Sequence, residues 1–351
     1  MSHLPSSPVL GIVIVAFNSA DVLLDCLESL LASEGVALRI VIVDNCSSDA
    51  TVTVLRDWAA GGQPYAPAKD LPFDVPTYVK PLPLHGDAGR FGGHRLCLIE
   101  AKVNGGFAAG VNLGLAHLTT QPELDRFWVL NPDSVAAPGS AVAFASCPAP
   151  AQGFAFMGGR VLYLEDPNII QIDGGTIDRR TGVTGNIGLY APHISTPPPN
   201  LNQMDFITGA SMVVSRRFYE MAGPMPEDYF LYYEEVDWAL RRQNLPLIYC
   251  PGAVVYHRAG TAIGSPTLGR PASPFSLYFK HRARIRFVRR YFPASLPMAY
   301  AYSVAKAAQL WLKGYRREAA TLLGASFGRP PADDIRTRLG PAAAERAFAK
   351  R

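Results

Sequence analysis

Two short runs of apolar, mostly β-branched residues constrain the fold of this chain more than any other feature. Residues 9–17 read VLGIVIVAF and residues 39–43 read RIVIV. Continuous apolar runs of this length are typical of parallel strands that are buried on both faces. Leucines recur at helical spacing through residues 20–33, and a second helical pattern covers residues 50–60. This alternation predicts an α/β fold with a mostly parallel central sheet flanked by helices.

Polar side chains follow the predicted strands directly. Asp44 ends the second strand, Asn131 and Asp133 follow a further strand at residues 127–130, and His257 ends a later apolar stretch. Open α/β sheets bind ligands at the carboxyl ends of their strands, so we expect these residues in one site. A carboxylate there suits Mg²⁺ or Mn²⁺, and a neutral imidazole can complete such a metal site. The alternatives are that Asp44 only caps a loop, that residues 131–133 form an ordinary Asn-Pro-Asp turn, and that His257 is a core histidine.

Three acids open a predicted helix at residues 234–242, directly after the aromatic stretch YFLYY. Glu234, Glu235 and Asp237 can stabilise the helix start through its dipole, but this role accounts for the presence of only one or two of the three acids. Poorly hydrated surroundings also raise the pKa of a carboxyl group and suit it to general-base catalysis. We therefore expect a catalytic base in this segment.

Several motifs, taken in chain order, resemble glycosyltransferase family 2 and within it the bacterial rhamnosyltransferase-like enzymes. They are VAFN at residues 15–18, VDNCSSD at 43–49, NGGFAAGVNLG at 104–114, WVLNPDSVAAPG at 128–139, the segment 208–241 that contains YYEEVDW, and the late His257. The resemblance covers roughly residues 9–290. It implies a GT-A fold, a nucleotide-sugar donor with dTDP-L-rhamnose as the candidate, a saccharide or lipid-linked glycan acceptor, and Mg²⁺ or Mn²⁺.

The same resemblance assigns roles residue by residue. Asp44, with Phe17 and Asn18, would contact the nucleotide, and the pocket for the nucleotide sugar would be lined by Asn104, Gly105, Gly106 and Asn112. Asp133 matches the last acid of the family's DXD motif and would hold the metal together with His257. Glu235 matches the catalytic base of an inverting transfer, although the adjacent Glu234 leaves this assignment open. Asn131 stands where the DXD motif has its first Asp, so we expect it to contact the sugar or the nucleotide instead. His281-Arg282 stands where the family has an RN pair, and no role is assigned to it.

Charge divides the chain into two regions. Residues 260–351 hold 17 Lys and Arg against 4 Asp and Glu, whereas residues 1–259 hold 16 against 25. We expect a catalytic domain over residues 1–258, with an irregular insertion at about 61–93, and a basic, mainly helical region over 259–351. The apolar stretch at 294–312 predicts an interfacial helix on an anionic membrane surface, and the alternative is a solvated helical cap. Nucleic acid explains the charge less well, because no binding motif accompanies it.

The five cysteines show no CxxC pair and no zinc-binding spacing, which predicts free thiols in a reducing compartment. The first eight residues lack the pattern of a secretory signal. We therefore expect a cytoplasmic protein, peripheral on the inner face of the plasma membrane. Two other functions remain open. A sugar nucleotidyltransferase would need a basic, Gly-rich loop after the first strand, where VAFNSAD has neither glycine nor a basic residue. A non-catalytic sugar-binding scaffold is supported by Asn131.

Overall fold

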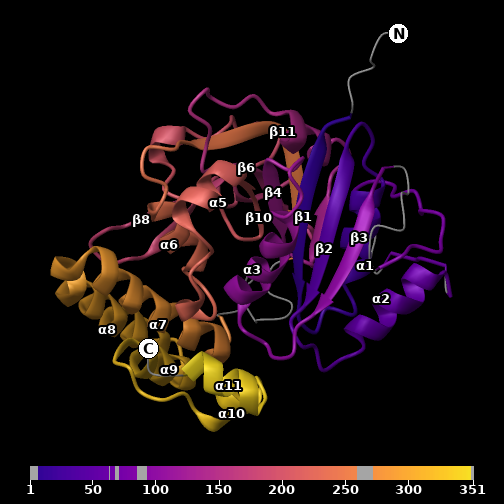
Figure 1. The fold of residues 1–351 in the computed structure, drawn as a ribbon. Coiled ribbons are helices and arrows are strands. Elements are labelled where there is room, and N and C mark those ends of the chain that lie inside the picture. Colours follow the sequence, from indigo (N-terminus) through magenta and orange to yellow (C-terminus); the bar gives the residue numbers. More distant parts are fainter. Residues whose placement is uncertain (1–6, 63, 68–70, 85–92, 259–271, 349–351) are drawn as a thin grey trace, which may run out of the picture.

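The computed structural model describes residues 7–62, 64–67, 71–84, 93–258 and 272–348. A curled, mixed sheet forms the centre, helices flank it, and the helices of the C-terminal part pack beside it (Figure 1). The predicted α/β fold with flanking helices and a helical C-terminal part is confirmed. The elements up to the fourth strand are β1 (Val9–Ala16), α1 (Leu23–Leu31), β2 (Ala37–Asp44), α2 (Thr51–Ala60), β3 (Arg95–Glu100), α3 (Phe107–Leu118) and β4 (Arg126–Leu130).

The middle of the chain completes the sheet. Its elements are β5 (Ser134–Ala136), α4 (Ser140–Ser146), β6 (Phe156–Tyr163), β7 (Ile170–Ile172), β8 (Gly174–Ile177), β9 (Thr184–Ile187), β10 (Ser211–Ser215), α5 (Arg216–Ala222), α6 (Glu234–Leu240) and β11 (Leu247–His257). The strand order in the main sheet is β3-β2-β1-β4-β10-β6-β11-β5, and β7 pairs with β6. Strands β3 to β4 are parallel, as predicted, but β10 runs antiparallel to β4 and β6, and β5 runs antiparallel to β11. The sheet is therefore mixed rather than mostly parallel.

Side chains alternate between two cores along the first strand. Ile12 and Ile14 pack with α1 and α2 on one face, whereas Val13 and Val15 pack with α3 on the other. Helix α3 lies very close to β1, because β-carbons added at Gly110 and Gly114 would come within 2.5 Å of the Val15 and Val13 side chains. Two glycines of the 104–114 motif are thus needed for helix packing.

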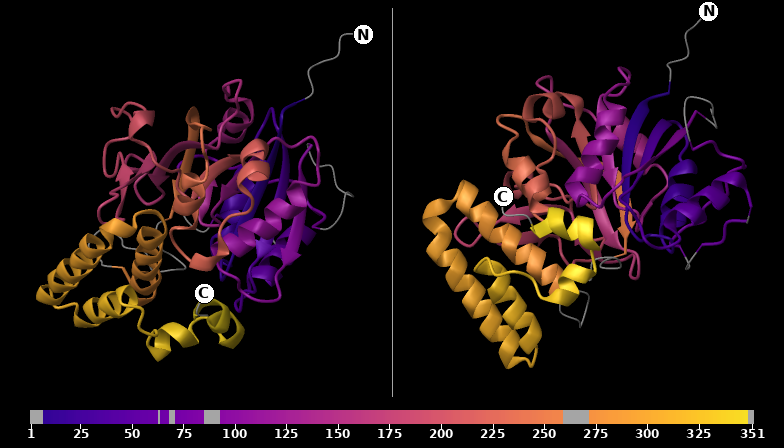
Figure 2. Two further views of the ribbon diagram at one scale, coloured as in Figure 1. Left: turned by 60° about the vertical axis from the view of Figure 1, so that its left-hand side comes forward. Right: turned by 60° about the horizontal axis from the view of Figure 1, so that its bottom comes forward.

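The C-terminal part is helical throughout its described elements, which are α7 (Pro274–Tyr291), α8 (Leu296–Leu312), α9 (Arg316–Ser326), α10 (Asp333–Thr337) and α11 (Pro341–Phe348). They form a group of their own at one end of the molecule (Figure 2). Among the described residues, no helix combines the length and the apolar composition needed to span a bilayer. The predicted insertion at 61–93 is described only in part. Its residues 64–67 and 71–84 carry no helix or strand, and residues 63, 68–70 and 85–92 lie outside the described residues.

Candidate active site

One edge of the sheet gathers most of the predicted site residues. Ala16 and Asp44 end β1 and β2 side by side in register, and Leu130 ends the parallel strand β4 one position before Asn131. The last residue of β11, His257, pairs with the first residue of β5, Ser134. Asp133 therefore lies next to His257 although more than a hundred residues separate them, as the positions at strand ends predicted.

Asp44 keeps one carboxylate oxygen without a hydrogen-bond partner among the described residues. The side chain is 5% exposed, and the Ser47 backbone N–H donates to Oδ2 at 3.1 Å. No described residue makes a hydrogen bond to Oδ1. Buried polar atoms are almost always paired, so this oxygen is an acceptor available to a ligand. Asn18, at φ 51°, supports the same region, because its Oδ1 accepts from the Ser48 backbone N–H at 2.8 Å. The half-buried Phe17 directly precedes it.

A network of two buried asparagines holds the glycine-rich loop. Asn45 Nδ2 donates to Asn104 Oδ1 at 3.1 Å and to the Gly106 carbonyl at 3.0 Å, while its Oδ1 accepts from the Gly105 N–H at 3.2 Å. Gly106 lies at φ 89°, and the next N–H, of Phe107, donates to the Phe230 carbonyl at 3.0 Å. The loop is thereby fixed both to the end of β2 and to the aromatic segment before α6.

Asn112 occupies a different position from its predicted neighbours in the pocket lining. Its Oδ1 accepts from the Met225 N–H at 2.9 Å, and its Nδ2 donates to the Met225 carbonyl at 2.9 Å and to Glu227 Oε1 at 3.0 Å. The amide thus joins α3 to the segment before α6. A direct contact with the donor stays a prediction for this residue.

Asp133 and His257 form a pair at the end of β11. Asp133 Oδ1 lies 3.2 Å from His257 Nε2, and Asn131 Nδ2 lies 3.3 Å from the same nitrogen. The other ring nitrogen, Nδ1, lies 2.7 Å from Gln171 Oε1. An amide oxygen can only accept, so Nδ1 carries the hydrogen and Nε2 is left to face Asp133. Burial lowers the pKa of His257, but the Asp133 carboxylate and, more weakly, Glu165 outweigh burial, so that the pKa is raised.

The Asp133–His257 pair fits a small divalent cation in part. A carboxylate oxygen and an imidazole nitrogen converge, and the second ring nitrogen is held by an amide, as is usual for metal-binding histidines. Within the described residues, no group of three or more His, Cys, Asp or Glu side chains could hold a metal ion. The described residues would thus supply two ligands, leaving the other positions to water and donor phosphates, an arrangement that Mg²⁺ accepts.

The two glutamates at the start of α6 differ in their surroundings. Glu234 is 3% exposed and its Oε2 has no hydrogen-bond partner among the described residues. Burial and the neighbouring Glu235 carboxylate raise the pKa of Glu234 well above its usual value. Glu235 is more exposed. Burial raises its pKa too, but backbone hydrogen bonds and the Lys280 ammonium oppose that rise. Glu235 is thus the more readily ionised acid of the pair.

The turn before β10 contacts both Glu235 and the segment that carries Asp133. A β-carbon added at Gly209 would lie 4.0 Å from Glu235 Cγ and 3.3 Å from the Phe107 ring. The neighbouring Ala210 carbonyl accepts from the Asn131 N–H at 3.0 Å. The base candidate, the glycine-rich loop and the Asn131–Asp133 turn therefore meet around residues 209–210.

Two residues of this region were missed in the sequence. Gln171 lies on a three-residue strand inside a stretch without clear periodicity, and no local signal marks it. Asp237 was interpreted only as a helix-start acid, yet it is fully buried and accepts hydrogen bonds from Tyr229, Arg241, Arg290 and Tyr291 at 2.6–2.8 Å. Its spacing of four residues from Arg241 was the available signal. Asp237 ties the helix of Glu235 to α7.

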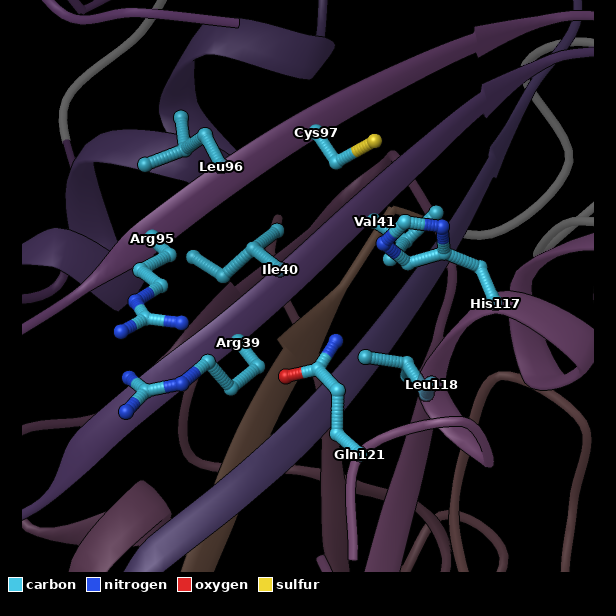
Figure 3. A pocket seen from close by; sticks show the side chains of 9 residues that line it. All are labelled: Arg39, Ile40, Val41, Arg95, Leu96, Cys97, His117, Leu118 and Gln121. Atoms are coloured by element: carbon cyan, nitrogen blue, oxygen red, sulfur yellow. The ribbon is translucent and has the colours of Figure 1, made fainter. Parts of the chain in front are cut away.

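A pocket elsewhere on the molecule does not belong to this site. It is lined by Arg39, Ile40, Val41, Arg95, Leu96, Cys97, His117, Leu118 and Gln121 (Figure 3). Arg39 and Arg95 lie near the beginnings of β2 and β3, at the opposite end of these strands from Asp44. Its lining contains no carboxylate, and the chemistry described above lies at the other edge of the sheet.

Parts of this chain are similar in sequence to known proteins. Residues 11–68 match the family model described as glycosyl transferase family 2. A segment of 44 residues, 12% of this chain, is 50% identical to the succinoglycan biosynthesis protein ExoO of Rhizobium meliloti, and it spans only 13% of that protein.

Two solved structures share the fold. The mannosyltransferase PcManGT from Pyrobaculum calidifontis, in complex with GDP-Man and Mn²⁺, aligns with a TM-score of 0.51 and 16% identity over 92% of this chain and 87% of its own. GalNAc-T7 with UDP, GalNAc and Mn²⁺ aligns with a TM-score of 0.54 and 13% identity, over 96% of this chain and 59% of its own. The rhamnosyltransferase-like subtype is not among these findings. The fold predicted from the motifs is confirmed, since the chain has the GT-A fold of these two structures, and residues 11–68 match the family that the motifs predicted.

Proposed function

We propose that this chain transfers a sugar from a nucleotide-sugar donor to a hydroxyl group of a glycan acceptor, with inversion at the anomeric carbon and with Mg²⁺ or Mn²⁺. One observation carries the proposal: the turn at residues 209–210 contacts both Glu235 and Asn131, which begins the turn that carries Asp133. The family match and the two related structures, which contain nucleotides and Mn²⁺, support it.

The donor would lie along the strand ends. Asp44 would accept a hydrogen bond from the base or ribose at its unpaired Oδ1, and the loop at Gly105 and Gly106 would pass close to the diphosphate. Asp133 and His257 would hold the cation, with Gln171 fixing the imidazole. When bound, a divalent cation neutralises the negative charge that develops on a departing diphosphate.

Glu235 would act on the acceptor. Its carboxylate takes the proton from the attacking hydroxyl while the new C–O bond forms at the anomeric carbon and the bond to the diphosphate breaks. General-base assistance of this kind is typically worth about 10²- to 10⁴-fold in rate. Glu234, whose pKa is raised further, keeps its proton to higher pH and adds no second negative charge there.

The setting we propose is the assembly of a bacterial surface polysaccharide, which the partial likeness to ExoO supports. The candidate donor is dTDP-L-rhamnose, and the candidate acceptor is a saccharide or a lipid-linked glycan. The basic C-terminal region, with 17 Lys and Arg against 4 Asp and Glu, supports a position on an anionic membrane surface, at the inner face of the plasma membrane.

The test is release of nucleoside diphosphate from a panel of nucleotide sugars by the full chain, with Mn²⁺, with Mg²⁺ and with neither. Three variants accompany it: Glu235→Gln, Glu234→Gln and, as a control for loss of a surface carboxylate, Glu220→Gln on α5, whose side chain is 63% exposed.

We expect Glu235→Gln to lose about 10²- to 10⁴-fold in turnover while donor binding stays intact. Glu234→Gln should retain most turnover, because glutamine resembles the protonated acid, and Glu220→Gln should behave as the parent. A parental rate for Glu235→Gln together with a loss in Glu234→Gln would move the base to Glu234. Binding without release of nucleoside diphosphate under any condition would favour the sugar-binding scaffold that Asn131 suggests.

A further inference from the structure

Helix α8 buries mainly small residues and exposes several large apolar ones. Its inward face consists of Ala299, Ser303, Ala307 and Leu310, which pack against α7 and α9. Arg284 of α7 fixes this face by donating to the Ala299 carbonyl at 3.1 Å and to Ser303 Oγ at 2.5 Å. Only four residues of α8 are buried against the rest of the described structure, whereas nine of its 17 residues are exposed.

The outward face of α8 is almost entirely apolar. Four large side chains on it are 44–77% exposed, namely Met298, Val304, Trp311 and Leu312. The exposed residues between them are mainly Pro and Ala. Gln309 is the exception, and it accepts a hydrogen bond at 2.8 Å from the half-buried Lys306, the one charged residue of the helix. Phe327, stacked on Tyr300 at 4.9 Å and 55% exposed, continues this surface beyond the helix. We call these residues the α8 face. A helix of 17 residues is about 25 Å long, so the face is extended.

Surface helices normally show the opposite arrangement, with the polar residues outward. Large contiguous apolar surfaces on proteins usually mark sites of contact with a partner or a membrane. Figure 1 places α8 on the far side of α7 from the sheet, and it packs with α7 and α9. The α8 face is thus turned away from the catalytic edge.

The charges around the α8 face indicate which kind of partner it contacts. Helix α8 contains no Asp or Glu, and its C-terminal end is followed by the exposed Lys313, Arg316 and Arg317, of which Arg317 pairs with Asp334. The Arg316 guanidinium lies 5.8 Å from the Trp311 ring centroid, and Tyr315 is adjacent. Large apolar residues beside aromatic and cationic ones are the pattern of helices that lie in a membrane interface and bind anionic lipids.

We infer that the α8 face rests in the headgroup layer of an anionic lipid membrane. Helix α8 lies in this layer without crossing it, which agrees with the lack of a spanning helix among the described residues. The inference depends on the proposed function only for the acceptor: a membrane-bound enzyme meets a lipid-linked glycan on the same surface.

Flotation with lipid vesicles tests the inference on the full chain. The vesicles contain phosphatidylcholine alone or phosphatidylcholine mixed with phosphatidylglycerol. The test variant is Val304→Glu/Leu312→Glu, and the matched control is Val79→Glu/Ile194→Glu, which changes two aliphatic residues that are 80% and 89% exposed elsewhere. A third variant, Lys313→Gln/Arg316→Gln, tests the cations. Release of nucleoside diphosphate is measured for every variant without vesicles.

We expect the parent and the control to float with the mixed vesicles and to bind the neutral ones more weakly. Burial of one Leu-sized side chain contributes about tenfold, so Val304→Glu/Leu312→Glu should lose about a hundredfold in partitioning. Lys313→Gln/Arg316→Gln should lose the preference for phosphatidylglycerol. Parental release of nucleoside diphosphate in these variants would separate this result from the proposed function.

Three results would overturn the inference. The first is a parent that stays unbound with both kinds of vesicle. The second is equal flotation of parent and Val304→Glu/Leu312→Glu. The third is a parent dimer in light scattering that Val304→Glu/Leu312→Glu converts to a monomer without any vesicle binding, since the α8 face would then contact a second copy of the chain.

Discussion

Gly106→Ala should separate the glycine-rich loop from the segment that carries the base. A β-carbon at this position would lie 2.2 Å from the Phe230 carbonyl oxygen and 2.9 Å from the Phe230 Cα and carbonyl carbon. All three atoms are backbone, so no side-chain rotation relieves the overlap. The loop and residues 230–235 must move apart, and the 3.0 Å hydrogen bond from Phe107 N–H to the Phe230 carbonyl is lost or stretched.

The magnitude follows from a matched glycine. Gly106 lies at φ 89° and ψ 176°, and Gly223 lies at φ 75° and ψ −170° with nothing within 4 Å of an added β-carbon. Backbone strain in this region costs about 1–3 kcal/mol for alanine at either position. Gly106→Ala adds about 1–3 kcal/mol for overlap and about 1 kcal/mol for the hydrogen bond. Its free energy of unfolding should therefore fall by about 2–4 kcal/mol more than that of Gly223→Ala.

Urea denaturation of both variants measures this difference, and release of nucleoside diphosphate measures its effect on the site. We expect Gly106→Ala to release far less product at concentrations where it is still folded, whereas Gly223→Ala keeps parental activity. Equal destabilisation and equal activity of the two variants would refute the claim that the loop and the base segment are fitted to each other.

Three further outcomes follow from the contacts around the site. Lys280→Met removes the ammonium that opposes the raised pKa of Glu235, so this pKa should rise further. Because a base must be ionised, the acidic limb of the rate–pH profile should then move to higher pH. An unmoved limb would contradict the role of Glu235. Gln171→Leu should weaken the apparent Mn²⁺ affinity by about 10- to 100-fold without changing nucleotide binding in the absence of metal, and calorimetry checks both. Asp237→Ala leaves Arg290 without its fully buried partner and should lower the free energy of unfolding by about 3–5 kcal/mol in urea denaturation. Arg317→Ala, which breaks an exposed pair with Asp334, should cost less than about 1 kcal/mol.

Much of the fold could be predicted from local sequence because the strands β1, β2 and β4 are short, mostly apolar runs buried on both faces, and β1 and β2 are rich in β-branched residues. Their polar ends predicted the shared edge that holds Asp44 and Asp133, since parallel neighbours end at the same side. The antiparallel β10 could not be predicted in this way, because its direction depends on pairing with β4 and β6 rather than on its own residues.

Contacts between distant segments account for what the sequence did not reveal. Gln171 contacts His257 from a strand 86 residues earlier, and Asn112 forms hydrogen bonds with the backbone of Met225, 113 residues later. The choice between Glu234 and Glu235 likewise depends on which side chain the aromatic segment buries. Side-chain burial and pairing of this kind follow from the packed structure and leave no periodic signal.

The most direct test of one donor site at the sheet edge is calorimetric titration of the chain with a nucleoside diphosphate and Mn²⁺. Asp44→Asn should lose a hydrogen bond to a charged group and Asp133→Asn should lose a metal ligand, so each should weaken binding by about tenfold to a hundredfold. Arg95→Gln in the opposite pocket should leave binding unchanged. Unchanged affinity in both Asp variants together with a loss in Arg95→Gln would place the nucleotide at the other end of the strands and contradict the account.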